Sequence, residues 1–348
     1  MTQSSFVIRV MLVAGVGTLL VAAPGAQSRV ARIIQTNAAG DNAHVIDPVT
    51  NKVVGVIDGI EVPHGVSAAP DGRKLFITNE SLRTVDAIDP QTWKVEKRIP
   101  LSGRPNNLMV SRDSKKVYVG IAQAPGAVDV IDAVTMTRIK SVPVEGSVHN
   151  VYVTPDGKFA VSGSVATGVI SVIDTKTDTL AWNLKLDAGI RPMMFDTNAD
   201  GSTRNIYVQL SNYHGVAVVD FASRKEAKRF ELPAVPGEEK ELEGLQGSPA
   251  HGLAVTPDQK TLLATSKWYG AMYAYSIPDF KHLGTVVVGS HPEWLTLTPD
   301  GRTAYVAIAG DDQTVAVDIK SLKVTAHIPV GYVPKRNGTI LLASAGTR

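Results

Sequence analysis

A unit of strand, turn and strand is clearest in the stretch Gly289-Ser-His-Pro-Glu-Trp-Leu-Thr-Leu-Thr-Pro-Asp-Gly-Arg-Thr-Ala-Tyr-Val-Ala-Ile308. Residues Trp294–Thr298 and Thr303–Ile308 are rich in β-branched and aromatic side chains, which favour strands. Between them Pro299 fixes φ for the first corner of a turn, and Gly301 tolerates the positive φ that the turn requires. The stretch therefore predicts a β-hairpin.

The same unit recurs along the chain. Its turn aspartate recurs at intervals of 42, 43, 44, 58 and 42 residues, at Asp71, Asp113, Asp156, Asp200, Asp258 and Asp300. A second landmark, an apolar strand that ends in Asp, occurs at Asp47, Asp89, Asp132, Asp174, Asp220 and Asp318, with Ser276 as the degenerate seventh copy. A period of about 40–45 residues with four strands is typical of a propeller blade.

The two landmarks predict how the ring closes. Residues Ala31–Ile57 carry only the later strands of a blade, and Gly331–Leu342 resembles the start of a repeat with no second strand after it. Together these segments complete one blade, which removes the exposed edge that a linear array would have. We therefore predict an all-β, seven-bladed propeller of four-stranded blades, closed by a composite N- and C-terminal blade.

Three strands that follow these turns also resemble a known family. Phe76-Ile-Thr-Asn79, Tyr118-Val-Gly120 and Tyr305-Val-Ala307 are similar to the signature of the YVTN family of seven-bladed β-propellers. The resemblance covers nearly all of the chain after Val30. It implies the fold, whereas propellers of this kind serve several unrelated functions.

Composition narrows the possible functions. The 348 residues are 44% hydrophobic and carry a formal net charge of +2, so no strong positive field points to nucleic acid. The chain has no Cys, which excludes disulfides, thiol catalysis, Cys-ligated zinc, iron–sulfur clusters and a lipid anchor on Cys. The mature sequence also lacks the common nucleotide-binding, α/β-hydrolase and HExxH motifs.

The first 28 residues have the pattern of a signal peptide. Arg9 precedes the apolar run Val10–Ala23, and the small residues of Ala22–Ser28 suit cleavage. The alternative is an uncleaved membrane anchor, for which the apolar run is short. We expect residues 1–28 to be a cleaved signal, residues 29–348 to form a single propeller domain, and the protein to be periplasmic or secreted.

Polar residues gather where the innermost strand of each blade begins. Seven positions before the turn Asp, or at the position aligned with it, lie His64, Asn106, His149, Met193, His251, Glu293 and Lys335. Arg336 lies one step further in, and Arg104, Arg191 and His291 lie two steps back. Because equivalent strands face a common axis, we expect these side chains to meet at one mouth of the central channel.

This composition suggests two kinds of chemistry. His64, His149 and His251 are candidate ligands of a divalent transition metal (Zn, Cu, Fe or Mn), with Glu293 as a catalytic base or further ligand. His251, His291 and Glu293 are a more compact alternative set. Candidate ligand-binding residues are Asn106, Arg104, Arg191, His291, Lys335 and Arg336. A wet polar channel without a ligand is the simpler alternative.

Loops on the same face add to the mouth. The segment Leu232–Pro249 is longer than the other crossovers and ends beside His251, so it is a candidate flap. Three functions stay open: binding of a small ligand at the mouth, metal-dependent lyase, hydrolase or oxidoreductase activity there, or a scaffold for a redox or envelope protein. We expect a small-molecule or protein partner, no nucleic acid, and a monomer.

Overall fold

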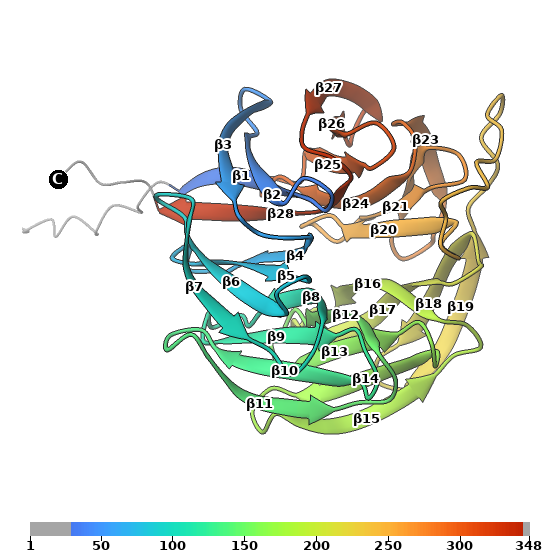
Figure 1. The fold of residues 1–348 in the computed structure, drawn as a ribbon. Helices are drawn as coiled ribbons and strands as arrows, with labels where there is room; N and C mark the ends of the chain where they lie inside the picture. Colours follow the sequence, from blue (N-terminus) through green and yellow to red (C-terminus); the bar gives the residue numbers. More distant parts are fainter. Residues whose placement is uncertain (1–28, 344–348) are drawn as a thin grey trace, which may run out of the picture.

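The computed structural model describes residues 29–343, which form a ring of seven four-stranded antiparallel sheets (Figure 1). The predicted signal peptide lies outside the described residues. Within residues 29–343, no helix is both long enough and apolar enough to cross a membrane.

Each blade contributes four strands, and the innermost strand lines the centre of the ring. The composite first blade contains β28 (Pro334–Ala343), β1 (Arg29–Asn37), β2 (Asn42–Asp47) and β3 (Lys52–Asp58), and the second contains β4 (Pro63–Ala68), β5 (Leu75–Asn79), β6 (Thr84–Asp89) and β7 (Lys94–Pro100). The third blade contains β8 (Pro105–Val110), β9 (Lys116–Ile121), β10 (Ala127–Asp132) and β11 (Thr137–Pro143), and the fourth contains β12 (Val148–Val153), β13 (Phe159–Ser164), β14 (Val169–Asp174) and β15 (Thr179–Lys185).

The remaining three blades follow the same order. The fifth contains β16 (Ile190–Thr197), β17 (Thr203–Leu210), β18 (Gly215–Asp220) and β19 (Lys225–Glu231), and the sixth contains β20 (Ala250–Val255), β21 (Thr261–Ser266), β22 (Ala271–Ser276) and β23 (His282–Val287). The seventh contains β24 (Pro292–Leu297), β25 (Thr303–Ile308), β26 (Gln313–Asp318) and β27 (Lys323–Pro329).

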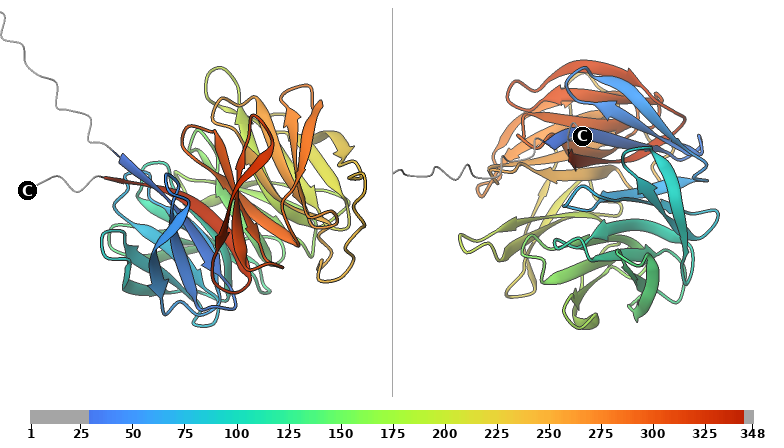
Figure 2. Two further views of the ribbon diagram at one scale, coloured as in Figure 1. Left: turned by 90° about the horizontal axis from the view of Figure 1, so that it is seen from above. Right: turned by 90° about the vertical axis from the view of Figure 1, so that its left-hand side faces the viewer.

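The predicted closure of the ring is confirmed. Strand β28 pairs antiparallel with β1, and the register runs from Arg29 opposite Ala343 to Asn37 opposite Pro334. Figures 1 and 2 show these two strands, from opposite ends of the chain, side by side in one sheet. The inner edge of the N-terminal strands is therefore covered by the last strand of the chain.

The apolar core lies between neighbouring blades. The strands alternate, so that successive side chains pack against the two flanking sheets. Four blades bury an aromatic side chain at the same register position of their second strand, namely Phe76, Tyr118, Tyr207 and Tyr305. Full burial of one large apolar side chain stabilises a fold by roughly 1.5–3 kcal/mol. The repeat thus places an equivalent buried aromatic side chain in each of these four blades.

Candidate functional site

One residue from each blade forms a ring at the mouth of the channel. In most blades the first residue of the innermost strand pairs with the last residue of the second strand, as in Pro63 opposite Asn79 and Pro292 opposite Ile308. The next residue is the ring member. The ring consists of His64, Asn106, His149, Arg191, His251, Glu293 and Lys335.

The fifth blade corrects the sequence prediction. Ile190 pairs with Leu210 in the position that Pro292 takes opposite Ile308, so Arg191 and not Met193 is the ring member. Met193 is fully buried in the apolar core. Counting back from the turn failed because β16 and β17 are each 8 residues long, whereas most inner strands have 6. The longer hairpin moves the turn away from the mouth.

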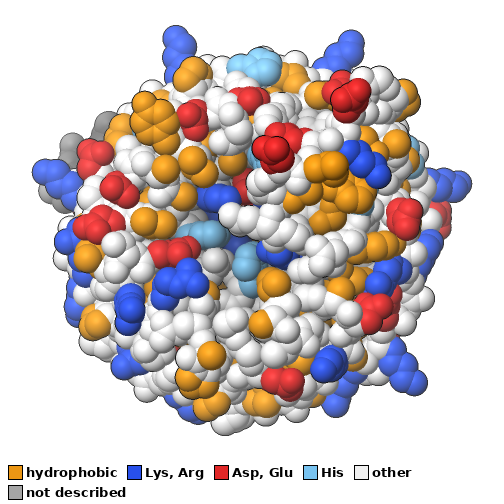
Figure 3. Space-filling view, turned by 45° about the vertical axis from the view of Figure 1, so that its right-hand side comes forward, with side chains coloured by type: hydrophobic (Ala, Val, Ile, Leu, Met, Phe, Trp, Pro, Cys, Tyr) orange, Lys and Arg blue, Asp and Glu red, His pale blue; other side chains and the backbone are white. Residues whose placement is uncertain are grey.

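The ring lies on one face of the propeller. Figure 3 shows histidine side chains together with Lys and Arg side chains in a hollow at the centre of this face, partly crossed by chain. The loops between the second and third strands of the second and sixth blades open on the same side, because Glu80 and Lys267 from these loops contact ring members. The mouth is therefore built by inner-strand ends and by these loops together.

Glu293 is the centre of one half of the ring. Its Oε1 accepts hydrogen bonds from Lys267 Nζ and Lys335 Nζ at 2.7 Å each, and its Oε2 lies 3.3 Å from Nδ1 of His251. Burial alone would raise the pKa of Glu293, but attraction from His251, Lys267 and Lys335 holds that pKa far below its usual range. Glu293 is therefore a carboxylate shared by two ammonium groups.

His251 stays neutral beside this carboxylate. Burial lowers the pKa of His251 well below its ordinary value; Glu293 opposes this shift, while Lys267, Arg336 and Lys335 add to it. Its Nδ1 faces both the carboxylate and the backbone oxygen of Glu293 at 3.3 Å, so Nδ1 carries the proton. The lone pair of His251 is then on Nε2, where it can accept a hydrogen bond or a proton.

The second blade, next to the composite blade that carries Lys335, contributes a second acid. Glu80 Oε1 lies 2.6 Å from His64 Nδ1, and Glu80 Oε2 accepts a hydrogen bond of 2.9 Å from Arg104. Burial is the main reason why the pKa of His64 is lowered, although Glu80 opposes the shift. Arg104 and Glu80 compensate each other at the rim, so this pair adds no net charge.

A chain of hydrogen bonds joins Arg336 to His149. The guanidinium Nη2 of Arg336 donates to Oδ1 of Asn150, and Nδ2 of Asn150 contacts Nδ1 of His149. Because the amide nitrogen can only donate, Nδ1 of His149 accepts, and the proton of the neutral ring is on Nε2. His149 and His251 lie edge to face with ring centroids 6.2 Å apart. One imidazole thus offers a donor and its neighbour an acceptor.

Arg336 is a buried cation with free donors. It is 2% exposed, and its guanidinium lies over the indole of Trp294 at 4.1 Å from the ring centroid. Nη2 also approaches Oδ1 of Asn106 at 3.5 Å. Within residues 29–343, Nε and Nη1 form no hydrogen bond of good geometry, and no carboxylate forms an ion pair with the group. Burial lowers the pKa of Arg336, while the Tyr152 hydroxyl and the more distant Glu293 and Glu80 oppose that shift. A buried charge without a counter-charge is costly, so these donors favour an added acceptor.

Arg191 links the ring to the long crossover. It is 8% exposed, its Nε donates to Ser211 Oγ at 3.0 Å, and its Nη2 donates to the backbone oxygen of Gln246. Both of these acceptors are neutral oxygens. In addition, no Asp or Glu in residues 29–343 forms an ion pair with Arg191. Arg191 is therefore a second nearly buried guanidinium without a counter-charge.

The long crossover lies over the rim of the mouth. We define the flap as residues 232–249, between the end of β19 and the start of β20. Glu241 contacts Ser290 Oγ and lies 3.1 Å from Nδ1 of His291, whose Nε2 contacts the backbone oxygen of Glu243 at 2.8 Å. His291 therefore contacts the flap and lies beside the ring; its predicted role in ligand binding stays a prediction.

The predicted metal centre is not supported by the positions of its residues. Within the described part of the chain, no group of three or more His, Asp or Glu side chains could hold one metal ion. His64 is paired with Glu80, His149 with Asn150, and His251 with Glu293, in each case through Nδ1. In the compact alternative set, His291 contacts the flap through Nε2.

Two important residues were not selected from the sequence. Nothing in the loop after β21 indicated that the ammonium group of Lys267 reaches Glu293. Trp294 was assigned only to a strand, and its stacking under Arg336 depends on the contact between the seventh blade and the composite blade. Asn150 beside His149 was a visible signal, since two adjacent polar residues interrupt an otherwise apolar strand.

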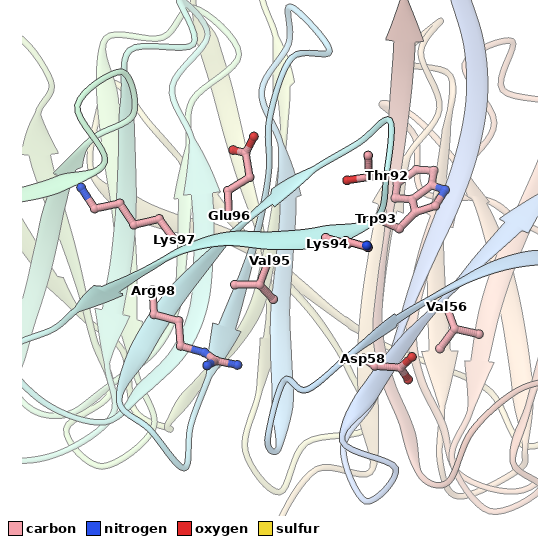
Figure 4. Close-up of a pocket in the computed structure, with 9 residues that line it drawn as sticks. All are labelled: Val56, Asp58, Thr92, Trp93, Lys94, Val95, Glu96, Lys97 and Arg98. Carbon is pink, nitrogen blue, oxygen red and sulfur yellow. The ribbon is translucent and has the colours of Figure 1, made fainter.

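A groove elsewhere on the molecule lacks these features. A hollow of about 650 Å³ lies at the outer strands β3 and β7, where it is lined by Val56, Asp58 and Thr92–Arg98 (Figure 4). Its charges are mixed and lie on exposed strand surfaces. The mouth is the stronger candidate because its charged groups are buried and converge.

The fold and the mouth define a closed seven-bladed propeller with a polar, cation-rich channel entrance. The chain belongs to the YNCE-like beta-propeller family, whose model matches residues 28–294. This match confirms the resemblance to YVTN-type repeats at the level of the seven-bladed fold. A comparison with curated proteins finds no match.

Solved structures share the fold over most of this chain. Hydrazine synthase of Kuenenia stuttgartiensis aligns with a TM-score of 0.72 and 20% identity, covering 89% of this chain and 100% of that one. The periplasmic gluconolactonase of Pseudomonas aeruginosa aligns with 0.71 and 20%, covering 89% and 99%. A Bacteroides fragilis protein assigned as a 6-phosphogluconolactonase aligns with 0.71 and 16%, covering 91% and 99%. At these identities the likeness establishes the fold.

Proposed function

We propose that this protein binds a small organic anion at the mouth of its central channel. The observation that carries the proposal is Arg336, a buried guanidinium whose Nε and Nη1 form no hydrogen bond of good geometry within the described residues. Hydrogen bonds between a guanidinium and a carboxylate are about twice as strong as those between neutral groups. A bound anion would therefore offset the cost of burying this charge.

The surroundings of Arg336 suit an anion rather than a cation. Arg191, Lys267 and Lys335 add positive charge, whereas Glu293 is already shared by two lysines. The neutral imidazoles of His149 and His251 supply one donor and one acceptor for uncharged parts of the ligand. Water in the channel is the competing explanation, because ordered water can also satisfy buried donors.

Titration calorimetry with acetate, succinate, citrate and inorganic phosphate at pH 7 and low ionic strength tests the proposal. We expect at least one organic anion to bind, and Arg336→Gln to weaken that binding by tenfold or more. Arg302→Gln is the matched control, because Arg302 is an exposed arginine beside Asp300 on the opposite face. The absence of heat for every anion, or equal binding by Arg336→Gln and the parent, would refute the proposal.

A second candidate is hydrolysis of a cyclic ester, which the pairing of His251 with Glu293 favours. Glu293 orients the imidazole, and the free Nε2 of His251 can take a proton from an attacking water. The ring oxygen of the ester then leaves with that proton, and the carboxylate product would suit Arg336. The likeness to gluconolactonase structures supports this candidate.

Acid release from glucono-δ-lactone, followed in a pH-stat with and without EDTA, distinguishes a hydrolase from a binding protein. We expect His251→Gln to abolish any activity that the parent shows above the spontaneous rate. A parent without activity leaves anion binding as the function.

The proposal includes a location outside the cytoplasm, in the periplasm or the medium. The pattern of Arg9, Val10–Ala23 and Ala22–Ser28 supports this location, as does the fold likeness to a periplasmic gluconolactonase.

A further inference from the structure

The positive charge at the mouth exceeds what one carboxylate can balance. Among residues 29–343, neither Arg336 nor Arg191 has a carboxylate partner, and Lys267 and Lys335 have one between them. Arg104 is balanced by Glu80. When the ring histidines are neutral, these five cationic side chains face two carboxylates, those of Glu293 and Glu80. About three positive charges are therefore left without a counter-charge at neutral pH.

The two unpaired guanidinium groups are fixed at separate places. Arg336 is held by Asn150 and Trp294 under the ring, whereas Arg191 is held by Ser211 and the flap backbone at Gln246. Arg191 enters the mouth from the fifth blade and Arg336 from the composite blade, so the two groups offer separate sets of donors to the acidic groups of one ligand.

His149 lies between these two sets of donors. Along the ring it is the neighbour of Arg191, since they occupy the same register position in the fourth and fifth blades. Through Asn150 it is connected to Arg336. Burial lowers the pKa of His149, and both guanidinium groups lower it further, which agrees with this placement. The Nε2–H of His149 is left to donate to whatever joins the two acidic groups.

We propose that the ligand is a small dicarboxylate, with one carboxylate on Arg336, the other on Arg191, and its middle beside His149. This inference rests on the proposed function and specifies its ligand. A phosphate monoester also carries two negative charges, but on one group, so it would use only one of the two sets of donors at full strength.

Calorimetry with matched pairs of ligands tests the inference. Succinate, glutarate and adipate are compared with their monoamides, which keep the length and lose one charge, and with glycerol phosphate. We expect at least one diacid to bind tenfold or more tightly than its monoamide. Arg191→Gln should reduce the diacid's affinity to about that of the monoamide, and Arg336→Gln should weaken both.

The outcomes separate the inference from the proposed function. If a diacid and its monoamide bind equally well, anion binding stands and the dicarboxylate inference is wrong. If glycerol phosphate binds more tightly than every diacid, a single doubly charged group is the ligand and the inference is also wrong. If no anion binds, the proposed function itself fails. The comparison of diacid with monoamide uses the unmodified protein, so misfolding of a variant does not affect it.

Discussion

At the scale of single residues, burial governs the mouth. Arg336, Arg191 and Glu293 are each less than 10% exposed, so their charges are stabilised by specific partners more than by solvent. His149 and His251 respond to the same burial by losing their protons. The site therefore combines fixed cations with imidazoles that gain charge only when the pH falls or an anion arrives.

The lowered pKa of His149 predicts a pH dependence of stability. A histidine whose pKa is lower in the folded state than in the unfolded state destabilises the fold as pH falls below about 6.5, because the unfolded chain takes up the proton first. Arg336, His251, Arg191 and His64 all oppose protonation of His149. We expect the unfolding free energy in urea to drop between pH 7.5 and 5.5, and to drop less in His149→Gln.

The control for this measurement is His327→Gln, since His327 lies exposed on the outer strand β27. Histidines remote from His149 contribute equally to every variant; burial lowers the pKa of His214 to about 4, for example. The difference between variants thus reports on His149 together with its coupling to His64 and His251. An identical loss of stability in His149→Gln and the parent would contradict the prediction.

Sequence spacing identified most ring members but not the side chains with which they pair. The equivalence of His64, His149 and His251 followed from the repeat, because equivalent positions of a propeller share a geometry. Their partners did not follow, because Glu80, Asn150 and Glu293 approach through side-chain rotamers and loop paths that no spacing encodes. This is why three histidines suggested a metal whereas the structure pairs each with a different side chain.

At the scale of elements, the flap is tied to the mouth through its C-terminal half. Arg191 contacts the backbone of Gln246, and His291 contacts the backbone of Glu243. Lys240 lies over the ring of Trp268 at 4.3 Å, so the segment also contacts the sixth blade. The sequence predicted this flap from its length alone, and its contacts show that it covers part of the rim.

Two glycines of the flap offer a matched test of this contact. Gly244 has φ +65° and a Cβ there would lie 2.9 Å from Nε2 of His291, whereas Gly237 has φ +84° and nothing within 4 Å. Both Ala variants meet backbone strain, but only Gly244→Ala pushes the flap off His291. We expect trypsin to cleave after Lys240 several-fold faster in Gly244→Ala than in Gly237→Ala. Equal rates would show that the His291 contact does not hold the flap.

At the scale of the whole molecule, stability depends on the closing strand. Removing residues 339–348 deletes the pairs from Thr339 opposite Ile33 to Ala343 opposite Arg29 and uncovers an edge of β1. We expect this truncation to lower the melting temperature markedly and to promote aggregation. Removing only residues 344–348, which lie outside the described sheet, is the control. If the variant that lacks residues 339–348 melted at the same temperature as the full-length protein, β28 would be dispensable.

The number of blades and the closure of the ring could be predicted from the sequence, whereas the exact position of one mouth residue could not. The turn aspartates and the strands ending in Asp carry a period that is typical of propeller blades, and the incomplete repeats at the two ends predicted the composite blade. The error at Met193 arose inside one hairpin, where β16 and β17 gain residues without breaking the pattern. A local change in strand length of this kind leaves the number of blades unchanged, but it changes which residue of the inner strand lies at the mouth.

The pairing of β1 with β28 also sets an order of events during synthesis. Gln35 and Asn337 hydrogen-bond across 302 residues of sequence, and at ~5–20 residues per second a ribosome needs roughly 15–60 s to cover that distance. During this interval β1 presents unpaired N–H and C=O groups to its surroundings. A second copy of the chain can supply its own last strand to that edge, so folding at high chain concentration should favour exchanged dimers over closed monomers.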